Sequence, residues 1–561
     1  MEKTYDVIIL GGGLAGLTLS IQIKKQRPST SILILESRDA SAATAAHKVG
    51  ESTVELGSYY LREVLGLTPY LEAHELPKHG LRFFFPSENK GDITTRVELG
   101  PRTDLTVPSH QLDRGTLENE LERHTKSLGT EIILGARVKD VDLSAQGSQV
   151  VYISKKETHT ASGTWIADAS GRVSVLKRKL GFEKPMDHAV SAVWFRLKGK
   201  IDIDDWSSSP SWRSITKPGL RYYSTVHFMD KGYWVWVIPL GSGNTSIGIV
   251  ADPAVHPFDT YNTYEKSMKW LEVNEPLCAK MLVREKEDVL DFKILNHYAH
   301  HTGQLYCADN RWGVTGEAGA FLDPLYSPGT DFIAMNNSWL SDLILRDLSG
   351  EDILLRAAVY QSSHLALVDS WIPIYQNKYP LMGSSQIMTF KIFWDWAIYW
   401  SVPTLLFTNN ALTDIKLLKE LFSSPTSLGR KFGQLHKVMQ DLFVAWGPHE
   451  QTLFPNHYID LFDMKSLLKL QQGIMVKHEP RALVEQVGRN MEVLEMMASQ
   501  LFRMVSHRVH GTPIDMKVDP YKISLEKGAD TGMNTGQSPD PALAKELEMM
   551  WYHTKKKEVM A

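Results

Sequence analysis

The stretch YDVIILGGGLAGLTLSIQIKKQRPSTSILILE, residues 5–36, decides the fold. It contains an apolar run over residues 5–10, a glycine-rich turn, a helical pattern over 17–25 and a second apolar run over 31–35. Short apolar runs of β-forming residues are typical of strands that are buried on both faces, as in a parallel sheet. The stretch therefore predicts a β-α-β unit at the start of such a sheet.

The glycine-rich turn has the spacing G-x-G-x-x-G. In such a motif the first glycine permits the tight turn, the second admits a pyrophosphate, and the third lets the helix pack on the strand. Glu36 follows Gly16 by 20 residues (36 − 16 = 20) and ends the second strand, where a carboxylate can accept both ribose hydroxyls of an adenosine. We predict a dinucleotide site rather than a purely structural turn, and its motif residues are Gly11, Gly13, Leu14, Ala15 and Gly16.

Composition narrows the class of protein. The chain has 561 residues, 61 Lys+Arg against 65 Asp+Glu, and 43% hydrophobic residues, which excludes a disordered or fibrous chain. The net charge of −4 argues against nucleic acid as the main partner. Two cysteines, Cys278 and Cys307, exclude a disulfide framework and favour a reducing, cytoplasmic location without a signal peptide. No histidines have metal-ligand spacing, so no metal site is predicted.

One segment raises the question of a membrane. Residues 387–407, IMTFKIFWDWAIYWSVPTLLF, are rich in aromatics, but Lys391, Asp395 and Pro403 interrupt them. A spanning helix needs about 20 mostly apolar residues with few charges. We predict a buried or cleft-lining helix and no transmembrane segment. The alternatives are a peripheral membrane contact or a docking face for a partner.

Later motifs distinguish FAD from NAD. Asp168-Ala-Ser-Gly171 closes one strand pattern, and Gly316-Glu317-Ala-Gly319 closes another. This order resembles flavoprotein monooxygenases of the glutathione-reductase-like type. The resemblance implies FAD, with Glu317 reaching the ribityl chain and Arg114 contacting the flavin from a helix start; the alternative for Arg114 is a surface salt bridge. It implies further cofactor contacts at Glu51, Ser52, Val138, Asp168, Gly171 and Thr330.

The resemblance also implies an organisation. The fold class is α/β (α+β overall), with a Rossmann-like FAD-binding domain, a β-sheet substrate platform and a mostly helical C-terminal region. Residues 1–190 form the FAD-binding part with an inserted β-rich segment, and 301–350 return to it. Residues 191–300 form the platform, because alternation there is strongly β. Residues 351–561 read as helices that cover the substrate side.

Four motifs together resemble the flavin-dependent halogenases, the tryptophan-halogenase-like family. They are GGGLAG at 11–16, GEST at 50–53, WVWVIP at 234–239 and FLDPLYSPG at 321–329. The spacing W-x-W-x-I-P is the most specific of them, although it can also mark the aromatic face of a core strand. In this family reduced FAD, oxygen and halide give hypohalous acid, which a lysine holds beside an electron-rich aromatic ring.

The lysine in the matching position is Lys78. Read alone it would be a solvated loop lysine; the resemblance instead implies a dry tunnel in which burial tunes its ammonium. Ser327 matches the partner that hydrogen-bonds near the lysine, and Trp234 and Trp236 wall the flavin side. The reduced FAD usually comes from a separate flavin reductase, so that partner is implied too.

Two residues depart from the family pattern. Free-tryptophan halogenases have a glutamate where this chain has Tyr326, which favours a phenol, pyrrole or other aromatic, free or tethered to a carrier protein. Pro328 has no N–H for the halide, so Gly329 keeps the one donor and Thr330 could compensate. The alternatives are a flavin monooxygenase or dehydrogenase without halide use, and a flavin-binding scaffold protein without turnover.

Overall fold

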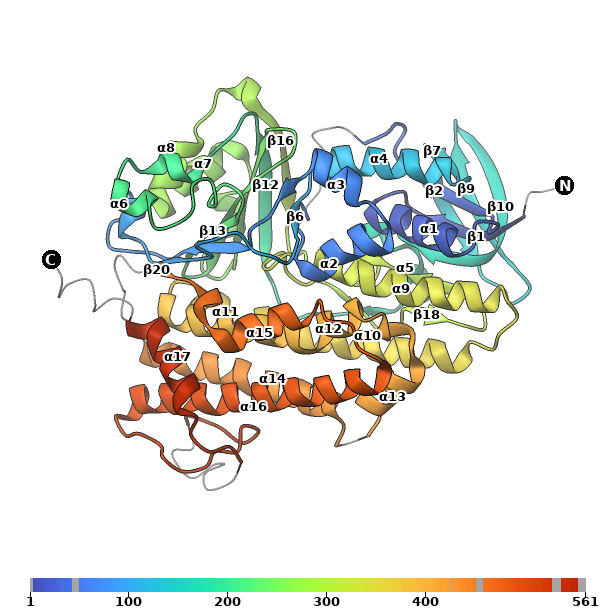
Figure 1. The fold of residues 1–561 in the computed structure, drawn as a ribbon. Helices are drawn as coiled ribbons and strands as arrows, with labels where there is room; N and C mark the ends of the chain where they lie inside the picture. The colour runs from blue at the N-terminus through green and yellow to red at the C-terminus, as the bar shows by residue number, and fades with distance from the viewer. Residues whose placement is uncertain (1–3, 43–49, 425, 451–457, 527–535, 553–561) are drawn as a thin grey trace.

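The structure, a computed structural model, describes residues 4–42, 50–424, 426–450, 458–526 and 536–552. Two sheet-containing parts lie side by side, and the helices of the C-terminal region form a layer along both of them (Figure 1). This arrangement confirms the mixed α/β class with a helical C-terminal region.

The first sheet contains the predicted β-α-β unit. Its strand order is β18-β19-β10-β1-β2-β7, and β1 pairs in parallel with both β2 and β10. The strands on this path are β1 (Thr4–Leu10), β2 (Ile32–Glu36), β7 (Glu131–Leu134), β10 (Glu157–Asp168), β18 (Tyr306–Cys307) and β19 (Trp312–Val314). Two further strands, β8 (Arg137–Asp142) and β9 (Ser148–Ser154), belong to the same sheet, because β9 pairs with both β8 and β10. One face packs against α1 (Leu14–Gln26), which lies beside α4 (Arg114–Ser127) and α9 (Gly329–Asp347). The carboxyl ends of the parallel strands therefore lie at the edge of the sheet next to the turn before α1. In such sheets, this edge is where ligands bind.

The glycine turn is as tight as the motif requires. Gly11 has φ +109° and donates its N–H to the Leu35 carbonyl at 2.9 Å. A Cβ on Gly16 would lie 2.1 Å from the Gly11 carbonyl oxygen, so no larger residue fits between helix and strand.

The second sheet is the platform. Its order is β16-β12-β15-β14-β13-β4-β5-β20, and all but two of its neighbouring pairs are antiparallel. The strands are β4 (Leu81–Phe84), β5 (Glu98–Leu99), β12 (Ser191–Leu197), β13 (Thr225–Asp230), β14 (Tyr233–Pro239), β15 (Thr245–Ala251), β16 (Val289–Leu295) and β20 (Tyr458–Ile459). The WVWVIP motif is the central strand β14. Gly248 on β15 faces Trp236, and a Cβ there would lie 2.2 Å from the indole.

The C-terminal layer is built from long helices. They are α10 (Leu354–Tyr375), α11 (Ser385–Tyr399), α12 (Leu405–Thr408), α13 (Ile415–Phe422), α14 (Leu428–Trp446), α15 (Lys465–Gly473), α16 (Pro480–His510) and α17 (Pro541–Tyr552). The aromatic segment forms α11, a π-helical turn that contains Pro403, and α12. Lys391 and Asp395 pair with each other inside the protein, so the prediction of a buried helix is confirmed. Within the described ranges, no helix is long and apolar enough to cross a membrane.

Candidate active site

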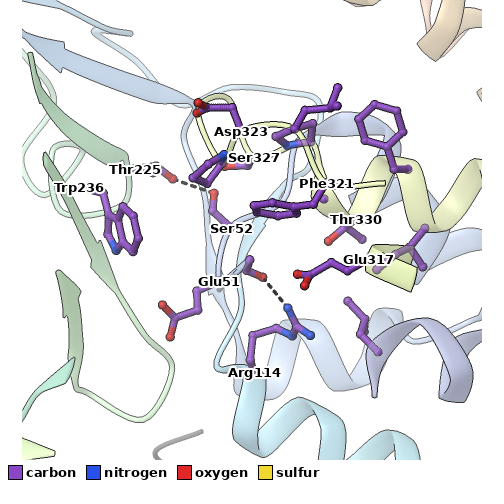
Figure 2. A pocket seen from close by; sticks show the side chains of 18 of the residues that line it. Glu51, Ser52, Arg114, Thr225, Trp236, Glu317, Phe321, Asp323, Ser327 and Thr330 are labelled. Carbon is purple, nitrogen blue, oxygen red and sulfur yellow. Dashed lines mark hydrogen bonds between the residues drawn. The ribbon is translucent and has the colours of Figure 1, made fainter. Parts of the chain in front are cut away.

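A pocket opens where the glycine turn, the FLDPLYSPG loop and the platform meet. We call it the cofactor-side pocket. The predicted residues that line it are Leu14, Glu51, Ser52, Arg114, Trp234, Trp236, Glu317, Ser327, Gly329 and Thr330. Figure 2 shows that Glu51 and Ser52 of the GEST segment, Arg114 at the start of α4 and Glu317 lie around the same space. Four motifs that are distant in the sequence thus converge on one cavity.

The adenosine end of the predicted site lies beside this pocket. Glu36 accepts a hydrogen bond from the Gly12 amide at 2.7 Å, so its carboxylate is fixed next to the glycine turn. Val138 lies on β8 (Arg137–Asp142), and Ala136, which precedes this strand, donates its N–H to the Glu36 carbonyl at 2.8 Å. Both residues lie away from the cofactor-side pocket itself. This separation suits an extended dinucleotide, whose two ends lie far apart.

Asp168, a predicted cofactor contact, stabilises the turn that follows β10. Its carboxylate accepts hydrogen bonds from the amides of Ser170 at 3.0 Å and Leu176 at 2.7 Å. Asp168 is fully buried and burial raises the pKa of its carboxyl group. It therefore holds the turn after β10 in place. Gly171, with φ +62°, belongs to the same turn and has open space where a Cβ would point.

Arg114 and Glu51 are both held by buried partners. Arg114 is the first residue of α4 and donates to the Gly50 carbonyl at 3.3 Å (Figure 2). It also forms an ion pair with Glu118 at 2.6 Å, but since Arg114 is only 9% exposed, this salt bridge is buried and not on the surface. Glu51 forms a buried ion pair with Arg196 on β12, with 2.7 Å between their charged groups. Each side chain therefore keeps a fixed direction toward the pocket.

The two tryptophans form the platform wall of the pocket. The Trp234 indole N–H donates to the Tyr379 hydroxyl at 3.1 Å, and the Trp236 indole N–H donates to the Ser246 hydroxyl at 3.1 Å. Their ring centroids are 5.6 Å apart. With their polar atoms satisfied and less than 4% of each residue exposed, the rings are rigid parts of the wall.

Lys78 is buried rather than solvated. It follows the short strand β3 (Leu76–Pro77) and is 2% exposed. Its ammonium donates to the Ser52 hydroxyl at 2.8 Å and to the Thr53 carbonyl at 2.6 Å. Burial lowers the pKa of Lys78 to about 7, although nearby Glu55 and Asp331 oppose the shift. Both protonation states are therefore accessible near neutral pH.

A second cavity begins at Lys78. We call it the aromatic chamber; its lining includes Glu55, Lys78, Tyr326, Pro328, Asp331, Trp371, Tyr375, Asp395, Trp396, Tyr399, Trp400 and Phe462. Ser52 lines the cofactor-side pocket, its hydrogen-bond partner Lys78 lines the chamber, and Pro328 lines both. The lysine thus stands at the boundary between two cavities and not in bulk solvent.

The Tyr326–Ser327 turn forms part of the same boundary. Both residues have positive φ, +71° and +61°, which is costly for side chains with a Cβ and is found mostly at functional sites. The turn places Tyr326 in the chamber and Ser327 in the cofactor-side pocket. The prediction that Ser327 hydrogen-bonds near the lysine therefore needs correction: the Lys78 ammonium donates to Ser52 and to the Thr53 carbonyl instead.

Two residues at the site escaped the sequence analysis. His227 lines the cofactor-side pocket, and burial together with the charge of Lys78 lowers its pKa to about 3, so its ring is neutral. Asp331 lines the chamber at 4% exposure. Only its position four residues after Ser327 could have drawn attention to it, because an aspartate in the first turn of a helix is otherwise common.

Comparisons with known proteins agree with this geometry. Residues 4–245 match the protein family described as "FAD binding domain". "Flavin-dependent halogenase chlA" of Dictyostelium discoideum is 29% identical over 71% of this chain and 70% of its own length. "1H-pyrrole-2-carbonyl-[peptidyl-carrier protein] chlorinase" of Pseudomonas fluorescens is 26% identical, over 60% of this chain and 74% of its own.

This chain belongs to the flavin-dependent halogenase family. A solved structure, "halogenase PltM in complex with phloroglucinol and FAD", has the same fold with a TM-score of 0.61 at 18% identity, covering 88% of this chain and 96% of that one. The halogenase is an FAD-dependent oxidoreductase, and FAD is its cofactor. The site fits FAD: the glycine turn admits a phosphate backbone, the first amides of α1 lack intrahelical partners, and Arg114 and Glu317 line the flavin end.

Proposed function

We propose that this halogenase transfers chlorine or bromine to an electron-rich aromatic ring held in the aromatic chamber, by way of an oxidant that Lys78 receives from the cofactor-side pocket. One observation carries the proposal: Lys78 is buried between two cavities and hydrogen-bonds to Ser52 in the first while it lines the second. A lysine so placed can take an oxidant from one side and present it to the other.

The cofactor-side pocket supplies the binding groups for FAD. Bound FAD supplies the electrons with which oxygen and halide yield hypohalous acid. The glycine turn would hold the pyrophosphate, Glu36 the ribose, and Arg114 and Glu317 the flavin end. Trp234 and Trp236 close the platform side and keep an aromatic substrate out. A flavin reductase as separate source of reduced FAD belongs to the same proposal.

The halide would bind at the start of α9. Pro328 offers no N–H there, so the donors are the amides of Gly329 and Thr330 and the Thr330 hydroxyl. The positive end of the helix dipole favours an anion at this place. The site is weaker than one with an additional amide, because one charged hydrogen bond contributes about 1.5–3 kcal/mol.

Lys78 has the properties that the transfer needs. Its pocket excludes water, which strengthens hydrogen bonds to the oxidant. The lowered pKa makes the amine available as well as the ammonium, so the side chain can bind hypohalous acid in either form. Ser52 and the Thr53 carbonyl fix the position of Nζ, and we assign them a positioning role. Ser327 orients the oxidant from the cofactor-side pocket.

The chamber favours a flat, neutral aromatic substrate. Six aromatic residues line it besides Tyr326, and rings stack favourably on such walls. Relatives are named for pyrrole groups on a carrier protein and for tetracycline, and PltM was solved with phloroglucinol. With Tyr326 in place of a glutamate, we propose a phenol, pyrrole or indole type of substrate other than free tryptophan, either free or carrier-bound.

Product mass tests the proposal. A panel of phenols, pyrroles and indoles is incubated with enzyme, a flavin reductase, FAD, NADH and either chloride or bromide. We expect products heavier by one chlorine or bromine, with a yield that depends on the halide. Products heavier by one oxygen without halide dependence would instead show a monooxygenase on the same scaffold, and NADPH consumption without added reductase would support that outcome.

A further inference from the structure

The aromatic chamber holds a carboxyl group that the proposed transfer does not use. Asp331 lies in the first turn of α9 and is 4% exposed. Its Oδ1 accepts a hydrogen bond from the Gly57 amide at 2.7 Å. Across the described ranges, no basic side chain forms an ion pair with it. The group is thus positioned by a neutral donor, and it faces the cavity that Lys78 also lines.

The other chamber carboxylates are differently engaged. Asp395 pairs with Lys391 and also accepts hydrogen bonds from Gln440 at 2.6 Å and from Tyr326 at 3.1 Å. Both of its oxygens are therefore occupied. Glu55 accepts a hydrogen bond from the Gln471 amide at 2.9 Å, which directs it toward the C-terminal layer. Asp331 is the chamber carboxylate best placed to take a proton from a bound molecule.

We propose that Asp331 is a catalytic base, which accepts the hydroxyl proton of a phenolic substrate while the ring attacks the halogen held at Lys78. This inference rests on the proposed function and narrows its substrate class to hydroxylated aromatics. The chain lacks the carboxylate that free-tryptophan halogenases carry before the serine, and Asp331 brings one into the chamber from the following helix.

The step balances without a further reactant. The ring carbon ortho to the hydroxyl forms a bond to the halogen of hypohalous acid, and the oxygen–halogen bond breaks with its electron pair on oxygen. The phenol O–H proton passes to Asp331, and its bond pair becomes the C=O of a dienone. The ring C–H proton then joins the released hydroxide as water, and Asp331 returns its proton to the phenol oxygen. The sum is ArH + HOX → ArX + H₂O.

The surroundings of Asp331 suit a base for phenols. The groups that face it are Lys78, Glu55, Tyr399 and Tyr375. Burial raises the pKa of Asp331 to about 8, Glu55 contributes to the increase, and Tyr399, the Gly57 amide and Lys78 counteract it. A base with a pKa near 8 is closer to a phenol, at about 10, than an ordinary aspartate at about 3.9. Proton transfer from a phenol to Asp331 therefore costs less free energy than proton transfer from a phenol to a solvated carboxylate.

The direct test is Asp331→Asn with two phenols of equal size. Asparagine keeps the acceptor for Gly57 and removes the base. The probes are phenol, which is almost entirely un-ionised at pH 8.5, and 2,3-difluorophenol, whose hydroxyl is more acidic and is largely ionised at that pH. We expect the variant to lose about 10²-fold in kcat with phenol, as removal of a general base does. With the fluorinated probe, which needs no base, the loss relative to wild type should be less than about 5-fold.

The pH profile gives a readout that a structural role would not change. The base form of Asp331 increases as the pH rises through about 8, so wild-type kcat with phenol, which stays un-ionised over that range, should rise. Asp331→Asn should lack this limb, and Asp331→Glu, which keeps a carboxylate, should retain it. The Glu variant serves as the second probe if the Asn variant does not fold. Asp369→Asn, an exposed carboxylate on α10, is the matched control and should leave both probes unaffected.

The possible results distinguish a failure of this inference from a failure of the proposed function on which it rests. Equal losses of Asp331→Asn on both probes, or an unchanged pH limb, would overturn the base while halogenation itself stands. Wild-type enzyme that halogenates a pyrrole or an indole but no phenol would overturn this inference and leave the proposed function standing. Halogenation of no member of the panel would overturn both. A loss confined to phenol, together with the missing limb, supports Asp331 as the base.

Discussion

The two cavities of the halogenase are built in different ways. The cofactor-side pocket is formed by loops that carry sequence motifs, and its key contacts involve backbone groups at Gly11, Gly50 and the start of α9. The aromatic chamber combines side chains of α10 and α11, which carry no motif, with residues from several other segments, including Tyr326 and Pro328 of the FLDPLYSPG motif. In the proposed function, oxidant formation thus relies on the motif loops, whereas substrate binding relies on side chains from elements that are far apart in the sequence. Lys78 lines the chamber and connects to the cofactor-side pocket through its hydrogen bond to Ser52.

The largest effect is expected where the cavities meet. Lys78→Met keeps the volume of the side chain but removes the amine, so product formation should fall at least about 10³-fold, the scale for loss of a catalytic group that acts in the transition state. The absorption spectrum of bound FAD should not change, because Lys78 does not line the cofactor-side pocket. Normal halogenation by Lys78→Met would show that the lysine is not the relay; Lys198→Met, an exposed lysine, is the control.

Removal of the lysine's hydroxyl partner should have an intermediate effect. Ser52→Ala leaves Nζ with the Thr53 carbonyl alone and takes away one charged hydrogen bond, which contributes about 1.5–3 kcal/mol. We expect kcat to fall about 10-fold or more. Ser338→Ala, on the part of α9 away from the cavities, provides the comparison. A variant rate equal to that of wild type would mean that Ser52 does not position the amine.

Burial of Lys78 should cost stability in a pH-dependent way. Its pKa is about 7 in the folded protein and about 10.5 when unfolded, so the unfolded state binds more protons between these values. The loss of unfolding free energy that burial of the Lys78 ammonium causes is at its full size below pH 7. It becomes smaller as the pH rises and disappears near pH 10.5. Relative to Lys78→Met, wild type should gain about 2 kcal/mol of unfolding free energy between pH 7 and pH 9. Denaturant unfolding measures this, and a constant difference would argue that the amine is solvated.

The smallest effect concerns the halide. Pro328→Ser restores a backbone N–H at the start of α9, so the KM for bromide should fall about 5-fold to 10-fold while the KM for the aromatic substrate changes little. Steady-state rates over a range of bromide concentrations give both constants. An unchanged halide KM would mean that this amide does not face the anion.

Much of the cofactor side could be predicted from the sequence, because short motifs determine local backbone. The β-α-β unit, the position of Glu36 beside the turn and the strand with Trp234 and Trp236 follow from residues close in the chain. Ser52 as the lysine's partner could not be predicted, since Ser52 and Lys78 are 26 residues apart and meet through tertiary packing. The bonds from the Asp168 carboxylate to the turn that it precedes could not be predicted either, and its contact with the cofactor stays a prediction.

The lining of the aromatic chamber could not be predicted from the sequence in this way. Its walls combine the segments near Lys78, Asp331 and Trp371 with α11 and the loop at Phe462. Helical periodicity predicts that a helix buries one face, but not which neighbour that face meets. Asp331 therefore looked like an ordinary helix-start residue until the structure placed it opposite Lys78.

The separation of oxidant formation from substrate is tested most directly by an experimental structure with FAD and a phenolic substrate both bound. The account predicts the flavin ring in the cofactor-side pocket between Arg114 and Trp236, and the substrate ring in the aromatic chamber within contact of the Lys78 amine and the Asp331 carboxylate. A substrate ring that stacks directly on the flavin, with Lys78 contacting neither, would contradict it.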